Sequence, residues 1–316
     1  MQDFAGLTAV VTGGGSGIGR ELAIQLAEQG CSVAICDVSV EGMTDTRRRA
    51  LHQAPQGTRV ASFVADVSDE DAVKAFARSA PRDLDTDRIH LLFNNAGIGG
   101  GASIVSGERA QWEKTFNVCW WGVYYSTLAF LPLLMRASEA RIVNISSVNG
   151  FWASIGPGRA HSAYCAAKFA VKGFSEALIT DLAANAPHVK CSVVMPGHIG
   201  TDIIANSRKI LAGGDGKPDI AELRKTFAAW GVDLSSQTDQ QVVTIAELQA
   251  QQFRETAPTT AAQAATIILD GVRAGKWRIL VGKDAEYLDA RVRAAPEEAY
   301  TPEFYASLLK ETNWRI

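Results

Sequence analysis

Short apolar runs alternate along most of the chain with longer segments in which apolar residues recur at helical spacing. The first such segment carries Leu22, Ala23, Leu26 and Ala27 on one helix face. The pattern predicts strands at residues 7–11, 31–36, 59–64, 89–93, 141–145, 189–195 and 277–281, and helices at 20–29, 41–53, 69–79, 108–136, 163–184 and 259–274. Because the strands are apolar throughout, we expect helices on both of their faces. This arrangement is a doubly wound α/β fold with a parallel sheet of about seven strands.

Two segments interrupt this alternation. Residues 202–258 form a long insertion, which we expect to be a substrate lid or a peripheral helical hairpin. Residues 284–316 follow the last predicted strand, and we expect their apolar side chains to pack on the same domain or on a neighbouring subunit. We therefore divide the chain into one domain, residues 1–283, and a C-terminal extension, residues 284–316. Pro132 is expected to bend or end the helix at 108–136.

Composition argues against several classes of protein. The 316-residue chain has a formal net charge of −3, so it lacks the basic excess that nucleic-acid binding requires. The five cysteines are scattered, and no cluster of His, Cys or Asp has ligand spacing, so we expect neither a disulfide framework nor a metal. We find no apolar window long enough for a membrane span and no signal peptide, and we expect a cytoplasmic protein without a membrane partner.

A glycine-rich turn, Thr12 to Gly19, lies between the first predicted strand and the first predicted helix. Backbone N–H groups and the helix dipole at such a position favour a pyrophosphate, and glycines let the phosphate approach the backbone. The spacing is G-x-x-x-G-x-G, with Ile18 where the common dinucleotide fingerprint has its third glycine. No Lys-Ser/Thr pair follows the glycines, which excludes a P-loop of the nucleoside-triphosphatase kind.

Asp37 ends the second predicted strand, in the position from which a carboxylate can accept hydrogen bonds from a ribose hydroxyl. The same charge would repel a 2′-phosphate. The sequence therefore favours NAD over NADP. Arg47, Arg48 and Arg49 lie further along the chain, and we expect them to form a solvent-exposed helix face rather than a phosphate site.

Further motifs follow the glycine turn in a fixed order: Asp66-Val67, Asn94-Asn95-Ala96-Gly97, Asn117, Ser147, Tyr164-x-x-x-Lys168, and the stretch from Pro196 to Thr201. Together they resemble the short-chain dehydrogenase/reductase family. The resemblance implies a Rossmann-type fold and a catalytic set of Asn117, Ser147, Tyr164 and Lys168. It also implies a homodimer or homotetramer that pairs through the helices at 108–136 and 163–184. The NAD site that it implies is formed by Gly13, Ser16, Gly17, Ile18, Gly19, Asp37, Asp66, Val67, Asn95, Ala96, Gly97, Tyr164, Lys168, Pro196, Gly197, Ile199 and Thr201.

The chemistry of this set can be argued from the residues themselves. Tyr164 and Lys168 are four residues apart in a predicted helix, so they share one face. We expect the Lys168 ammonium to lower the pKa of the Tyr164 phenol, which would then exchange a proton with a substrate oxygen as a hydride moves. Ser147, rather than Ser146, is expected to hydrogen-bond and orient the same oxygen. The predicted reaction interconverts a secondary alcohol and a ketone.

Two other classes of function remain open. One is a dinucleotide-binding sensor or scaffold without turnover, and the other is a structural subunit whose tail mediates assembly. The interval between Ser147 and Tyr164 is longer than in many members of the family, and its extra residues, within 151–161, are expected to border the substrate. The insertion carries Leu223, Phe227, Trp230 and Leu234, which could cover a bulky apolar alcohol or ketone. His198 is expected to be a loop residue without a role in proton transfer.

Overall fold

Seven parallel strands form the central sheet of the computed structural model, which describes residues 1, 3–100, 103–105, 107–213, 219–312 and 314. The strand order is β3-β2-β1-β4-β5-β6-β9. This order confirms the predicted Rossmann-type doubly wound sheet. The strands are β1 (Thr8–Thr12), β2 (Ser32–Asp37), β3 (Val60–Val64), β4 (Leu91–Asn94), β5 (Ala140–Ile145), β6 (Val189–Pro196) and β9 (Arg278–Val281).

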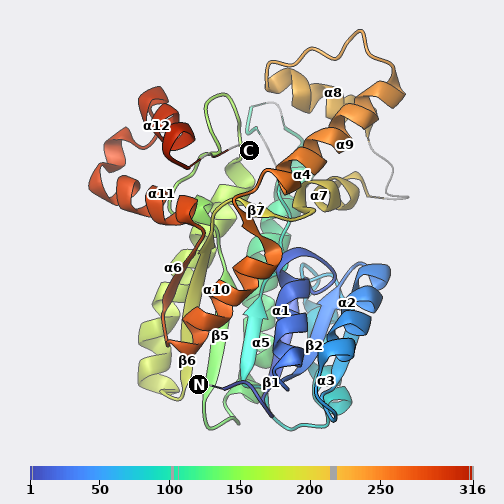
Figure 1. Cartoon of the computed structure of the whole chain (residues 1–316), viewed down its shortest axis with the longest axis vertical. Helices are drawn as coiled ribbons and strands as arrows, with labels where there is room; N and C mark the ends of the chain where they lie inside the picture. The colour runs from blue at the N-terminus through green and yellow to red at the C-terminus, as the bar shows by residue number, and fades with distance from the viewer. Residues whose placement is uncertain (2, 101–102, 106, 214–218, 313, 315–316) are drawn as a thin grey trace.

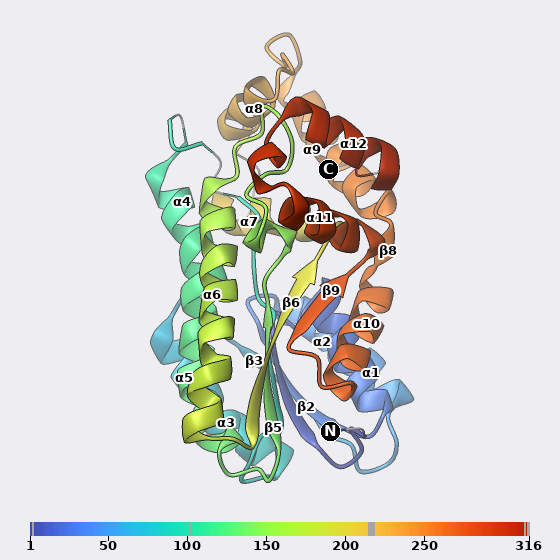
Figure 2. The same ribbon diagram turned by 90° about the vertical axis from the view of Figure 1, so that its left-hand side faces the viewer.

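Helices cover both faces of the sheet (Figures 1 and 2). One face packs against α1 (Gly17–Glu28), α2 (Val40–Gln53) and α10 (Ala261–Arg273), and the other against α3 (Glu70–Leu84), α5 (Gly122–Leu134) and α6 (Ser162–Asn185). Alternate residues of β1 enter different cores, Ala9 and Val11 one and Val10 the other, which explains why the middle of the strand is apolar. The expectation fails at β3, where Ser62 and Val64 are exposed because this strand forms the edge of the sheet.

The predicted helix at 108–136 is interrupted. It consists of α4 (Arg109–Phe116), a π-helical turn (Asn117–Trp121) and α5. Pro132 lies two residues before the last residue of α5, Leu134, so its effect is to end the helix. The π-helical turn begins at Asn117, one of the predicted catalytic residues, and such turns frequently occur at functional sites.

The insertion at 202–258 is mostly helical, apart from residues 214–218, which lie outside the described part of the chain. It contains α7 (Ile203–Ala212), α8 (Ile220–Ala229) and α9 (Asp239–Glu255), and it is bracketed by β7 (Ile199–Gly200) and β8 (Thr259–Thr260), which pair in parallel. Helices α8 and α9 share a small core formed by Leu223, Phe227, Leu234, Val242 and Ala246. The three helices lie beyond the carboxyl ends of the sheet strands, above the glycine turn (Figure 1).

The C-terminal extension packs on its own chain. It forms α11 (Lys283–Ala294), a 3₁₀ turn (Pro296–Glu298) and α12 (Pro302–Thr312), whereas residues 313, 315 and 316 lie outside the described part. Trp152, from the loop at 151–161, is fully buried against Phe304 and Trp314, with ring centroids 5.9 and 6.1 Å away. Its indole N–H donates to the Ala299 carbonyl at 2.7 Å. The tail and the longer loop therefore form one apolar cluster that closes this side of the site.

Candidate active site

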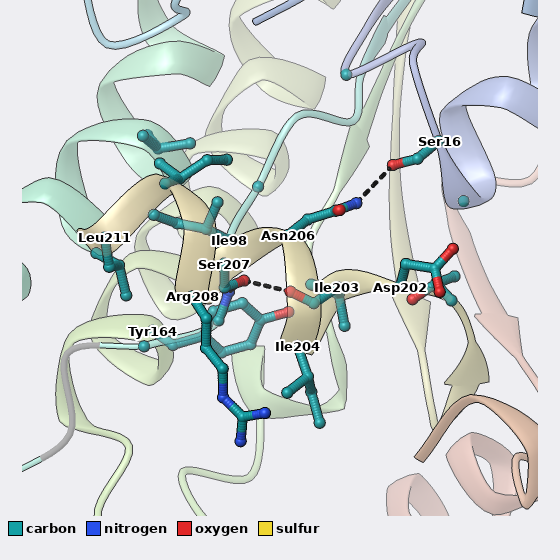
Figure 3. A pocket seen from close by; sticks show the side chains of 18 of the residues that line it. Ser16, Ile98, Tyr164, Asp202, Ile203, Ile204, Asn206, Ser207, Arg208 and Leu211 are labelled. Carbon is teal, nitrogen blue, oxygen red and sulfur yellow. Dashed lines mark hydrogen bonds between the residues drawn. The ribbon is translucent and has the colours of Figure 1, made fainter. Parts of the chain in front are cut away.

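A cavity of about 1170 Å³ runs along the carboxyl ends of the strands, from the glycine turn to Tyr164 and on beneath the insertion (Figure 3). Ligands of doubly wound sheets bind at this edge. The cavity wall brings together nearly all the predicted site residues. In the described part of the chain, only Gly19 and Asn117 lie outside it. The predicted residues on the wall are Gly13, Ser16, Gly17, Ile18, Asp37, Asp66, Val67, Asn95, Ala96, Gly97, Ser147, Tyr164, Lys168, Pro196, Gly197, Ile199 and Thr201.

The glycine turn is held by close backbone contacts. A Cβ on Gly13, whose φ is +69°, would lie 2.8 Å from the Cα of Ala96. A Cβ on Gly19 would lie 2.1 Å from the carbonyl oxygen of Gly13. The Asn95 side-chain amide donates to the carbonyls of Thr12 and Gly13 at 2.9 and 3.2 Å. Gly19 is thus required for packing behind the turn, rather than for forming the cavity wall.

The first turn of α1 fits a pyrophosphate. The helix starts at Gly17, so the N–H groups of Gly17, Ile18 and Gly19 lack acceptors within the helix. Within the described residues the Ser16 side chain caps none of these groups, and its Oγ accepts a hydrogen bond from Asn206 Nδ2 at 3.1 Å instead. This bond holds α7 beside the glycine turn (Figure 3). The donors are therefore available for phosphate oxygens between the turn and α7.

Asp37 lies on the cavity wall at the end of β2, as predicted. Its two carboxylate oxygens accept hydrogen bonds from the backbone N–H groups of Gly15 and Ser39, both at 2.9 Å. Arg20, which the sequence analysis missed, also lines this part of the cavity. Arg20 donates from Nε to Thr46 Oγ1 at 3.1 Å and lies 3.7 Å from Asp45.

Arg47, Arg48 and Arg49 are exposed, as expected for a solvent-facing helix surface. Arg48 and Arg49 pair with Asp45 at 2.6 and 2.8 Å. None of the three lines the cavity within the described chain. The structure therefore offers no arginine from this run to a 2′-phosphate at the cavity wall.

Asp66 and Val67 follow β3 and form the wall on the adjacent side. Burial opposes ionisation of Asp66, but hydrogen bonds from Lys114 and Ser68 hold its pKa below the usual range. The Lys114 ammonium lies 2.6 Å from the Asp66 carboxylate. A Cβ on Gly122 would lie 2.6 Å from Val67 Cγ2, so α5 packs directly against this loop.

Ser147 and Tyr164 meet in the middle of the cavity. Ser147 lies two residues after β5 and is the N-cap of a short 3₁₀ helix, Val148–Gly150. Its Oγ accepts a hydrogen bond from the backbone N–H of Asn149 at 3.1 Å. Its side chain and Tyr164 line the same cavity, and Ser147 acts on the Tyr164 hydroxyl in the direction that lowers its pKa. Ser146, in contrast, donates its hydroxyl to the Lys168 carbonyl at 2.8 Å. The choice of Ser147 over Ser146 as the catalytic serine stays a prediction.

Lys168 is almost fully buried one helical turn after Tyr164. Its ammonium donates to the Ile145 carbonyl at 2.9 Å and lies 5.4 Å from the centre of the Tyr164 ring. Burial lowers the pKa of Lys168. The expectation that Lys168 lowers the pKa of Tyr164 is wrong for this structure. Burial raises the pKa of Tyr164, the Cys119 thiol adds to the effect, and Ser147 opposes it.

Two histidines, His161 and His198, line the cavity near Tyr164 and the stretch from Pro196 to Thr201. The His161 ring lies 4.7 Å from the Tyr164 ring, centroid to centroid, and burial lowers the pKa of His161 to about 4. His198 is buried. Its Nε2 forms a hydrogen bond with the Phe253 carbonyl at 2.7 Å, and its backbone N–H donates to the Asp284 carboxylate at 2.6 Å. These contacts hold the ring and the backbone of His198 against Phe253 and Asp284.

Comparison with known proteins identifies the family. Residues 7–211 match the short chain dehydrogenase family. The chain belongs to the short-chain dehydrogenases. The protein named SadH of Mycobacterium tuberculosis is 36% identical over 293 residues, which cover 93% of this chain and 92% of SadH. Levodione reductase of Leifsonia aquatica is 32% identical over 209 residues, 66% of this chain and 75% of that protein.

Solved structures of short-chain dehydrogenases share the fold. A short-chain dehydrogenase/reductase from Burkholderia phymatum in complex with NAD is 27% identical and has a TM-score of 0.75, covering 96% of this chain and 98% of its own. A metagenomic short-chain oxidoreductase in complex with NADP is 29% identical with a TM-score of 0.52, covering 61% of this chain and 83% of its own. Membership of the family therefore establishes an oxidoreductase with a dinucleotide cofactor.

The described residues contain no group of three or more His, Cys, Asp or Glu side chains that could hold a metal ion. None of the described helices is both long and apolar enough to span a membrane.

Proposed function

We propose that this protein is an NAD(H)-dependent oxidoreductase that interconverts a secondary alcohol and a ketone, with Tyr164 as the general acid and base. The observation that carries the proposal is that Tyr164 and Ser147 line the same cavity as the glycine turn and Asp37. A proton donor, an orienting hydroxyl and a dinucleotide cradle thus share one space.

The bound nicotinamide would supply or accept the hydride. In ketone reduction, Ser147 donates a hydrogen bond that fixes the carbonyl oxygen, and Tyr164 delivers the proton to that oxygen as it gains charge. In alcohol oxidation the same phenol oxygen, once ionised, accepts the proton. Lys168 would contact the ribose of the cofactor with the donors that the Ile145 carbonyl leaves free.

Asn117 would support Lys168 indirectly, through water, from the start of the π-helical turn. Asn117 belongs to the same π-helical turn as Cys119, and the buried Cys119 thiol lies near Lys168. Asn117 is a positioning residue in this account, since it lies outside the cavity wall described above.

NAD is the proposed cofactor because Asp37 would lie against a 2′-phosphate. The relatives do not decide this point, because one similar structure contains NAD and another contains NADP. The proposed substrate has an apolar body, since the cavity beneath the insertion is lined by Ile155, Leu211, Leu223, Trp230 and Phe253. Levodione reductase, one of the relatives, is named for a ketone substrate. We further propose that the chain forms a homodimer or homotetramer.

Steady-state turnover tests the proposal. Purified protein is given NADH or NADPH with a panel of apolar ketones, and loss of absorbance at the reduced-nicotinamide band is recorded. The proposal predicts turnover that is faster with NADH than with NADPH. Tight NADH binding without turnover of any ketone or alcohol would favour the sensor or scaffold instead, and absence of binding to either nucleotide would contradict both.

A further inference from the structure

An arginine without an acidic partner lines the part of the cavity beneath the insertion. Arg208, on α7, lies between that helix and α9, and its guanidinium donates to the Ala246 carbonyl at 2.5 Å and to Gln249 Oε1 at 2.7 Å. Among the residues that the structure describes, no carboxylate lies within ion-pair distance of it. A guanidinium carries five N–H donors, so three remain for another group.

The position of Arg208 makes an uncompensated charge costly. Arg208 is partly buried, and this burial lowers its pKa. A charge removed from water is normally paired or heavily hydrogen-bonded, because its lost hydration must be replaced. The two neutral acceptors on α9 fix the orientation of the guanidinium but leave its charge without a partner.

Arg208 points away from the proposed cofactor phosphates. Asn206 projects from α7 toward Ser16 of the glycine turn, whereas Arg208, two residues later, projects from the opposite side of the helix (Figure 3). The same cavity wall carries the apolar Leu223, Trp230 and Phe253 of α8 and α9 and their connections, and Arg159 lies over the Trp230 ring. The charge therefore faces the substrate compartment.

We infer that Arg208 binds a carboxylate carried by the substrate, so that the protein acts on keto acids or hydroxy acids with an apolar body. The inference rests on the proposed function and names its substrate class. A planar guanidinium held by two fixed acceptors suits the two parallel hydrogen bonds of a carboxylate. Asp219 and Glu222 on the same wall would repel a doubly charged phosphate more strongly than a singly charged carboxylate.

The test compares a homologous series of aryl keto acids with their methyl esters, using NADH as the reductant. The wild-type protein is expected to prefer the acid at the best chain length by about 10- to 100-fold in kcat/KM, the range for a hydrogen-bonded charge pair. Arg208→Gln is expected to abolish this preference by raising KM for the acid, with little change in kcat and no loss on the ester. Arg208→Lys should restore part of it, because the charge remains while the paired geometry is lost.

Arg48→Gln is the matched control, because Arg48 is exposed on α2 outside the cavity. Equal losses on acid and ester in Arg208→Gln would show that Arg208 only ties α7 to α9, and an absent preference in the wild type would equally overturn the inference. If the protein turns over neither the acids nor the esters, the proposed function fails, and this result alone does not test the role of Arg208. Calorimetric titration of the NADH-bound protein with acid and ester then still decides whether Arg208 selects a carboxylate.

Discussion

The carboxylate of Asp37 accepts a hydrogen bond from the backbone N–H of Gly15, across the space where the glycine turn meets the end of β2. A Cβ on Gly15 would lie 2.9 Å from this carboxylate, so the turn and the acidic side chain fit together only with glycine at this position. The negative charge is therefore held in a fixed place on the wall of the proposed adenosine-ribose site.

This relationship predicts the effect of Asp37→Asn on cofactor choice. The amide keeps the size of the side chain and one acceptor oxygen, but it removes the charge that would repel a 2′-phosphate. We expect the ratio of kcat/KM for NADPH to that for NADH to rise by on the order of 10-fold. Steady-state kinetics with both reduced nucleotides measures the ratio, and an unchanged ratio would show that Asp37 does not set the preference.

A pair of glycine substitutions tests the packing of the cofactor turn. Gly19→Ala would place a methyl group against the Gly13 carbonyl and the Asn95 amide, so we expect a loss of several kcal/mol in the free energy of unfolding. Gly173→Ala, in the interior of α6, meets nothing within 4 Å and should stabilise the protein by up to about 1 kcal/mol. Urea denaturation measures both. Similar effects of the two variants would contradict the packing role of Gly19.

The partly buried ring of His161 predicts a pH-dependent stability. Its pKa is lowered to about 4 in the folded protein, whereas an unfolded histidine titrates near 6.5. Between these values the unfolded chain binds more protons, so the free energy of unfolding decreases as the pH falls, by on the order of 3 kcal/mol in total. His161→Gln should make this acid-side loss smaller.

Unfolding curves at a series of pH values between about 7 and 4 measure the free energy of unfolding of the variant and of the wild type. This range spans the two pKa values of His161, in the folded and in the unfolded chain. His52→Gln is the control, because His52 is exposed on α2 and the same substitution there should leave the pH dependence unchanged. A wild-type curve that parallels the His161→Gln curve throughout would show that His161 does not contribute.

The sequence predicts the sheet and the cofactor turn because both depend on local patterns. Continuous apolar runs identify the buried strands, and the order of the motifs places Asp37, Ser147 and Tyr164 at one edge of the sheet. The capping boxes at Thr238 and Gln241 and at Thr260 and Gln263 are also local signals, and the first of them could have located α9.

Other features depend on contacts between distant parts of the chain. Apolar spacing does not reveal the change of hydrogen-bond register that makes the π-helical turn at Asn117. The pairing of Trp152 with the tail requires the loop and the last helix to meet in space. The raised pKa of Tyr164 follows from burial by the surrounding elements, and the spacing of Tyr164 and Lys168 alone gives the opposite direction.

Turnover in a Tyr164→Phe variant tests the central claim most directly. The substitution removes only the hydroxyl, so NADH binding should be retained while kcat for ketone reduction falls by about 10²- to 10⁴-fold, the range for a lost general acid. Tyr287→Phe is the matched control, because the Tyr287 hydroxyl contacts Ser307 in the C-terminal extension at 3.4 Å. Full NADH binding with this loss of turnover is the predicted result. A Tyr164→Phe protein that reduces the ketone at the rate of the control would contradict the account.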